Sequence, residues 1–164
     1  MALQSISQFC DSNLPGIITI EYAPLDWIDQ TSYETIVNSN RNWQYSIPFA
    51  QGDWLKLPVY PGDKLWEEKE RSNQQGKYYE MELSGGTPKL RPQVTQQFEE
   101  MSELDFLLKL TDRNRQTWLL GTIVHPFRVQ TSARSGNRGQ GRNQYNVRFY
   151  SQSPKRAYGY LPVF

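Results

Sequence analysis

The stretch 64–83, KLWEEKERSNQQGKYYEMEL, decides the fold because it has the pattern of a β-hairpin. Its arms, KLWEEKERS and KYYEMEL, flank the residues Asn-Gln-Gln-Gly at 73–76, and Gly76 can take the positive φ of a tight turn. In the second arm the alternate residues Tyr79, Met81 and Leu83 share one face. The sequence therefore predicts two antiparallel strands here, followed by a break at SGGTP.

A second strand is predicted in GIITIEYAP, residues 16–24, because apolar residues there recur with a period of two. Ile18, Ile20 and Tyr22 are expected on one face, and Ile17 is expected on the other. Pro24 is expected to end this strand.

Two further strand candidates, WQYSIPF (43–49) and WLKLPVY (54–60), each contain a proline. A proline cannot donate a hydrogen bond to a neighbouring strand, so Pro48 and Pro58 place these segments at sheet edges or at bulges. Later segments with a strand-like composition are DFLLKL (105–110), WLLGTIV (118–124) and YNVRFY (145–150).

One segment has the period of a helix instead. Pro92 suits a first helical turn. Apolar residues then follow at intervals of three and four: Val94, Phe98, Met101 and Leu104. We predict one helix at about 92–104 among short antiparallel strands. The expected fold is mainly β, a β-sandwich or barrel, in a single domain that covers residues 1–164.

The composition excludes several classes of protein. An aromatic share of 13% argues against disorder, although the mean hydropathy is −0.73. No basic start precedes an apolar run, and no apolar stretch approaches the roughly 20 residues that span a bilayer, so we expect no signal peptide and no membrane span. Cys10 is the only cysteine, which rules out an internal disulfide and favours a reducing compartment.

Charge is distributed unevenly along the chain. Residues 1–111 carry 16 acidic and nine basic side chains, a net charge of −7, whereas residues 112–164 carry one acidic and nine basic side chains, a net charge of +8. Three of the late arginines are four residues apart, with glycines between them: Arg134, Arg138 and Arg142. This pattern predicts a flexible Arg/Gly loop at 131–143.

Three hypotheses fit this loop. In the first, its arginines bind nucleic-acid phosphates and nearby aromatic rings stack on bases, although a pI of about 7.8 is low for such a protein. In the second, it is a soluble connection without a partner. In the third, it docks on an acidic surface of another folded chain, and contacts between unlike surfaces of identical subunits produce rings or stacks.

The residues that carry common enzyme chemistry are scarce. His125 is the single histidine, and together with Cys10 it is too little for a zinc site. No phosphate-binding loop is present, and Glu80 and Glu82 are expected to be solvated rather than catalytic. We expect no enzyme activity, cofactor, metal or small-molecule substrate. A glycan-binding module is a third functional class, but the tryptophans are expected in the core or at interfaces: Trp27, Trp43, Trp54, Trp66 and Trp118.

Several motifs occur together in one order. CDSNLPGIITIEYAPLDWI (10–28) resembles the N-terminal signature of neck and tail structural proteins of tailed bacteriophages and related prophages. DFLLKLTDRNRQTWLLGT (105–122) looks like their paired strands around an Asp-containing turn that end in Leu-Gly. HPFRV (125–129) and the Ser-Gly loop before NQYNVRF (143–149) resemble later elements of the same proteins. The Arg-rich loop, and Asn-Arg in the turn where glycine is common, depart from that pattern.

The resemblance implies a β-sandwich subunit without enzymatic activity that assembles into rings around the channel through which DNA passes. A tail tube, a tail terminator and a neck connector all fit. It also implies that the protein is located in the virion, after assembly in the host cytoplasm. Copies of the chain and neighbouring virion proteins are the implied partners, with transient contact with packaged DNA.

We expect the assembly interface to use the late arginines and the aromatic C-terminus: Arg134, Arg138, Arg142, Arg148, Tyr158, Tyr160 and Phe164. Glu67, Glu68 and Glu70 of a neighbouring subunit are the expected acceptors for the loop arginines. A nucleic-acid-binding accessory protein that uses the Arg/Gly loop is the alternative.

Overall fold

The structure, a computed structural model, describes residues 14–36, 42–43, 45–136 and 141–161. The elements are β1 (Ile17–Pro24), η1 (Leu25–Trp27), α1 (Gln30–Ile36), β2 (Asn42–Trp43), β3 (Leu55–Lys56), β4 (Leu65–Asn73), β5 (Gly76–Pro88), α2 (Pro92–Ser102), β6 (Phe106–Asp112), β7 (Thr117–Leu120), β8 (Arg128–Arg134), β9 (Gln144–Ser153) and β10 (Tyr158–Tyr160).

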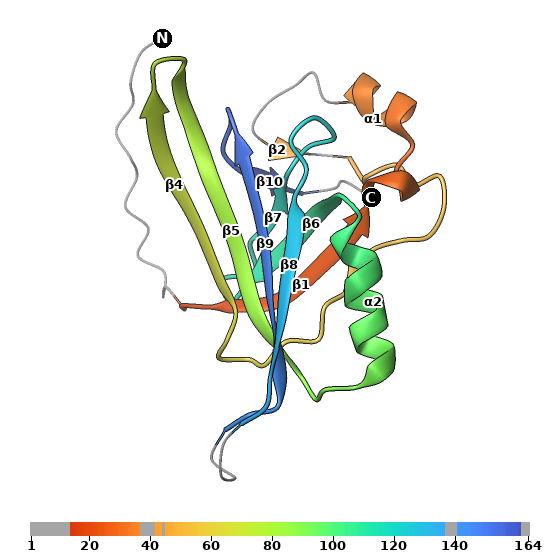
Figure 1. Ribbon diagram of the computed structural model, residues 1–164. Coiled ribbons are helices and arrows are strands. Elements are labelled where there is room, and N and C mark those ends of the chain that lie inside the picture. Colours follow the sequence, from red (N-terminus) through yellow and green to blue (C-terminus); the bar gives the residue numbers. More distant parts are fainter. Residues whose placement is uncertain (1–13, 37–41, 44, 137–140, 162–164) are drawn as a thin grey trace.

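The strands form two sheets (Figure 1). A six-stranded sheet has the order β2-β10-β7-β6-β1-β3, and a four-stranded sheet has the order β4-β5-β9-β8. All described strand pairs are antiparallel except β10 with β2. The predicted class, a mainly β protein with a sandwich of antiparallel strands, is therefore confirmed.

The predicted hairpin at 64–83 is present as β4 and β5, with Gly76 at a φ of 124° in the turn. The predicted break at 84–88 is wrong, because β5 continues through both glycines to Pro88. A Cβ at Gly85 would lie 2.5 Å from Cγ1 of Val59, so glycine is needed where the segment before β4 crosses this strand.

The main core lies between the two sheets. Leu83 and Phe149 contribute from the four-stranded sheet, and Leu108 contributes from the six-stranded sheet. The predicted helical stripe is confirmed, because Phe98 and Met101 of α2 are buried in this core. Helix α2 lies beside β8 and covers one side of the sandwich (Figure 1).

A second core covers the other face of the six-stranded sheet. Leu107 and Leu119 point into it, and Tyr33 of α1 stacks on Trp43 with 5.0 Å between ring centroids. Strand β6 is therefore buried on both faces, which explains its nearly continuous apolar run.

Helix α1 was not predicted. Its first turn is capped by Asp29, whose carboxylate accepts hydrogen bonds from Ser32.

The predicted faces of β1 are partly wrong. The register with β6 shifts between Ile17 and Thr19, which indicates a bulge. As a result Ile17 and Ile20 are both buried in the main core, whereas Ile18 is exposed.

The proline-containing segments form strands of only two residues, β2 and β3. Both lie at the ends of the six-stranded sheet, as predicted from their prolines. The predicted lengths are wrong, because neither Pro48 nor Pro58 is part of a strand.

The predicted Arg/Gly loop is too long at its start. Residues 131–134 belong to β8, which pairs with β9 from Arg128↔Tyr150 to Arg134↔Gln144. The connection between the two strands is 135–143, of which 137–140 lie outside the described residues. The arginine-rich segment therefore joins β8, which was not predicted, to β9, which contains the predicted strand 145–150.

Candidate functional site

The β8–β9 hairpin carries the loop arginines, and the structure places them differently from one another. Arg134 ends β8 and is exposed, without an ion pair among the described residues. Arg142 has Nη1 3.1 Å from Oδ2 of Asp63, and its guanidinium lies 4.7 Å from the ring of Tyr60. Arg138 lies outside the described residues. Arg142 thus has a partner in its own chain, where an intermolecular partner was expected.

The outer face of the four-stranded sheet is hollowed into a groove of about 570 Å³. Its basic side chains all pair with carboxylates: Lys69 with Glu67 at 3.1 Å, Arg71 with Glu80 at 3.1 Å, Arg148 with Glu82 at 2.9 Å, and Arg128 with Asp105 at 3.3 Å. The hydrogen bond from Arg148 lowers the pKa of Glu82. Because each cation is matched by an anion, this face offers no excess of positive charge.

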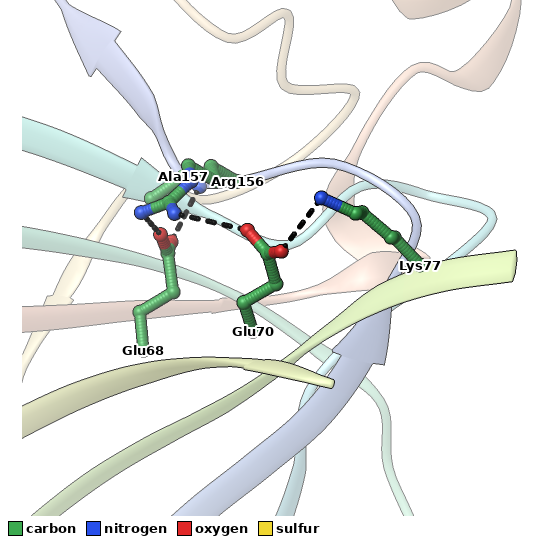
Figure 2. A network of polar contacts seen from close by, with 5 residues as sticks. All are labelled: Glu68, Glu70, Lys77, Arg156 and Ala157. Atoms are coloured by element: carbon green, nitrogen blue, oxygen red, sulfur yellow. Dashed lines mark hydrogen bonds and ion pairs between the residues drawn. The ribbon is translucent and has the colours of Figure 1, made fainter. Parts of the chain in front are cut away.

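A network of polar contacts joins the β4–β5 hairpin to the segment between β9 and β10 (Figure 2). Glu68 accepts a hydrogen bond from Nη1 of Arg156 at 3.1 Å and another from the N–H of Ala157 at 2.9 Å. Glu70 binds Arg156 at 3.5 Å and Lys77 at 3.0 Å, and the Lys77 hydrogen bond is the main cause of its lowered pKa. These glutamates, expected to accept arginines of another subunit, are therefore occupied within the chain.

The two tyrosines of the aromatic C-terminal segment pack into the fold, whereas Leu161 beside them is 54% exposed. Tyr160 is buried, and its hydroxyl accepts a hydrogen bond from the N–H of Ile47 at 3.2 Å. Tyr158 packs at the edge of the same second core. The expectation that these two rings dock on a partner is corrected to a role in the fold. Phe164 lies outside the described residues.

Of the residues weighed for catalysis that the structure describes, Glu80 pairs with Arg71 and Glu82 pairs with Arg148. The backbone carbonyl of His125 accepts a hydrogen bond from the hydroxyl of Ser151 at 3.4 Å. Among the described residues no group of three His, Cys, Asp or Glu side chains is placed to hold a metal ion. Across the same residues, no helix has both the length and the apolar character that crossing a membrane requires. Cys10 lies outside them.

Both edges of the four-stranded sheet are unpaired in the part of the chain that the structure describes. Strand β4, of nine residues, forms one edge, and β8, of seven, forms the other. Phe127, just before β8, exchanges two 2.9 Å backbone hydrogen bonds with Phe106 of β6. Strand alternation turns the backbone groups of Val129, Thr131 and Ala133 to that same side, where no described residue binds them.

This free edge of β8 opens into a second groove, of about 790 Å³. Strand β8 lines it with Val129–Ala133, and α2 lines it with Thr95, Phe98, Glu99 and Ser102. Strand β9 adds Tyr145, Asn146 and Arg148. An edge strand beside a helix is the arrangement that binds extended peptides by strand addition in several protein families. Local patterns in the sequence do not predict this groove, because they do not predict β8.

Among the described charged side chains that make no ion pair, two groups of like charge stand out. The acidic face of α2 consists of Glu99, Glu100 and Glu103. The basic corner consists of Lys64, just before β4, and Arg113 and Arg115 in the β6–β7 turn. Other described charged side chains, among them Asp26, Lys56 and Arg134, also lack an ion pair, but these two groups bring charges of one sign together.

Comparisons with known proteins give no match. No protein-family model matches the chain, and neither a curated protein nor a solved structure matches it significantly.

Proposed function

We propose that this protein is a structural subunit without enzymatic activity that assembles with copies of itself, of the kind found in the neck or tail of tailed bacteriophages. The observation that carries the assembly function is the pair of free edges of the four-stranded sheet. Strands β4 and β8 are its outermost strands, and both are long and largely exposed. Long exposed edges are ready to pair with another chain, and monomeric proteins commonly block them.

The direction of the two edges favours contact between unlike surfaces. Each neighbouring pair in this sheet is antiparallel, so β4 and β8 run in opposite directions. A second copy in the same orientation brings its β4 beside β8 of the first copy, again antiparallel. The sheet then continues from one subunit to the next. Repetition of such a contact closes into a ring or extends into a stack.

The phage assignment rests on the resemblance of the segments 10–28 and 105–122 to neck and tail proteins. The two-sheet fold agrees with the β-sandwich that this resemblance implies. In that role the protein belongs to the virion, beside other virion proteins and the DNA that passes through the ring.

The alternative, a nucleic-acid-binding accessory protein, has less support. Arg142 and Arg148 bind carboxylates of their own chain, which reduces the charge available for phosphates. A gel shift at low and moderate salt separates the alternatives. Strong, steeply salt-dependent binding to DNA by a monomer contradicts the assembly proposal.

Size-exclusion chromatography with light scattering, followed by electron microscopy, tests the proposal. We expect rings or stacks of the unmodified protein. Thr131→Pro removes an outward-facing N–H of β8 without breaking its pairing to β9, so it should abolish assembly and preserve the fold. Thr131→Ala keeps the N–H and is the matched control. A protein that is monomeric at every ionic strength and absent from particles contradicts the proposal.

A further inference from the structure

The acidic face of α2 and the basic corner lie at opposite edges of the four-stranded sheet. The acidic face of α2 borders the groove at the β8 edge, and Glu99 lines that groove directly. The basic corner is near the start of β4, on the opposite edge of the same sheet. Figure 1 shows α2 on the right and the start of β1, which the basic corner surrounds, on the left.

The basic corner is held together by backbone contacts. The ammonium of Lys64 donates to the carbonyl of Ile18, and the N–H of Arg113 donates to the carbonyl of Gly16 at 3.1 Å. Burial and the nearby charge of Arg113 both lower the pKa of Lys64. None of the three cations has an ion pair among the described residues, and the carboxylate of Asp112 in the same turn accepts hydrogen bonds from the N–H groups of Asn114 and Gln116 instead. Such a surface favours an anionic partner.

The acidic face of α2 has the complementary property. Glu100 accepts a hydrogen bond from the amide of Gln96 at 3.2 Å, and Glu99 and Glu103 make no side-chain contact with a cation among the described residues. Glu99 and Glu103 are four residues apart and therefore lie on one side of the helix. The wall of the β8 groove is thus negative on its solvent side.

We propose that the groove between β8 and α2 receives β4 of a second copy, and that the basic corner of that copy contacts the acidic face of α2. This inference rests on the proposed function, and it names the surfaces through which the copies meet. Three features select this occupant: β4 is a free strand of the right direction, the groove exposes backbone groups, and the charges beside the two edges are opposite. Complementary charge of this kind selects the partner and fixes the register.

Two charge-reversal variants test the contact. Glu99→Lys/Glu103→Lys makes both surfaces basic, and Arg113→Glu/Arg115→Glu makes both acidic. Each variant alone should self-associate at least about tenfold more weakly at low salt, because like charges then meet at every contact. An equimolar mixture should restore assembly, because every contact between unlike variants joins opposite charges.

Matched controls place the same charge changes on exposed residues away from both edges. Asp26→Lys/Glu34→Lys matches the first variant, and Lys56→Glu/Lys155→Glu matches the second. Light scattering across a salt series gives the association constants, and circular dichroism verifies that each variant is folded. Both controls should assemble like the unmodified protein.

The outcomes separate this inference from the proposed function. If the unmodified protein assembles and the charge-reversal variants assemble equally well, the contact is wrong and the function stands. If both variants fail and their mixture also fails while remaining folded, the two surfaces do not meet. Loss of assembly in the controls assigns the effect to net charge and overturns the contact. A strictly monomeric unmodified protein overturns the function and the inference together.

Discussion

Glu68 connects two segments that lie far apart in the sequence. Its two carboxylate oxygens bind Arg156 and the N–H of Ala157, and its side chain is only 12% exposed. Glu67, the preceding residue, points to the opposite face and pairs with Lys69 in a more exposed position. Adjacent glutamates that look alike in the sequence therefore have different energetic roles.

Glu68→Ala should lower the free energy of unfolding by about 1–3 kcal/mol, because it leaves a backbone N–H and a guanidinium without their acceptor. Glu67→Ala is the matched control and should cost about 0–1 kcal/mol, as is typical of an exposed ion pair. Urea denaturation followed by tryptophan fluorescence measures both. Equal losses in the two variants would show that the contacts of Glu68 do not stabilise the fold.

These residues also show where sequence reasoning stops. The charge totals predict that early acids and late bases attract one another, but they do not say whether the two meet in one chain or between chains. The structure pairs Arg142, Arg148 and Arg156 with carboxylates of the same chain. Partners in a folded chain depend on topology, which charge counting does not contain.

Among the elements, strand β5 has a glycine where the segment before β4 passes close to it. Gly85 is buried in the strand beneath Val59, which leaves no room for a side chain. Gly85→Ala should therefore destabilise the protein by about 1–3 kcal/mol, as overpacked sites do.

Val59→Ala removes the atoms that would collide with the new methyl group. The double variant Gly85→Ala/Val59→Ala should lose less stability than the sum of the single losses, which thermal denaturation of all three variants measures. If the stability losses of the two single variants add exactly in the double variant, contact with Val59 is not the reason that position 85 requires glycine.

Elements with a strong local pattern were predictable. The hairpin at 64–83 and helix α2 have clear periods, and both are present. Strand β8 was missed because only Val129 is buried along it, so it lacks alternation and is defined by its pairing to β9. Helix α1 is too short to show a period, although Asp29 before it is a recognisable cap.

On the scale of the whole molecule, the described residues form two cores, and each contains at least one tyrosine whose pKa is raised by burial. Burial raises the pKa of Tyr33 to about 12, and burial also raises the pKa values of Tyr22 and Tyr160. In the unfolded chain these groups ionise near pH 10. Their contribution is therefore complete below pH 10 and is lost as the pH rises toward 12.

We expect the free energy of unfolding to fall between pH 10 and 12, by roughly 2–3 kcal/mol from Tyr33 alone. Tyr33→Phe should weaken this dependence, because it keeps the ring on Trp43 and removes the ionisable group. Tyr45→Phe, at an exposed position, is the control. Chemical denaturation at several alkaline pH values measures the slope. An unchanged slope in Tyr33→Phe would assign the loss to other groups.

The presence of two sheets follows from the sequence, but the candidate interface does not. The single long helix and the edge position of the proline-containing segments could be predicted from local pattern, whereas the number of strands could not. The β8–α2 groove and the basic corner could not, because each joins residues from separate parts of the chain: 95–102 with 129–148, and Lys64 with Arg113 and Arg115.

The pairing of β5 with β9 has a consequence for biosynthesis. On the ribosome β5 is complete long before its central partner, since β5 ends at Pro88 and β9 begins at Gln144. Until β9 emerges, the nascent polypeptide presents an open apolar strand that neighbouring nascent chains can capture. Because apolar association weakens on cooling, a reduced growth temperature should increase the soluble yield of this protein.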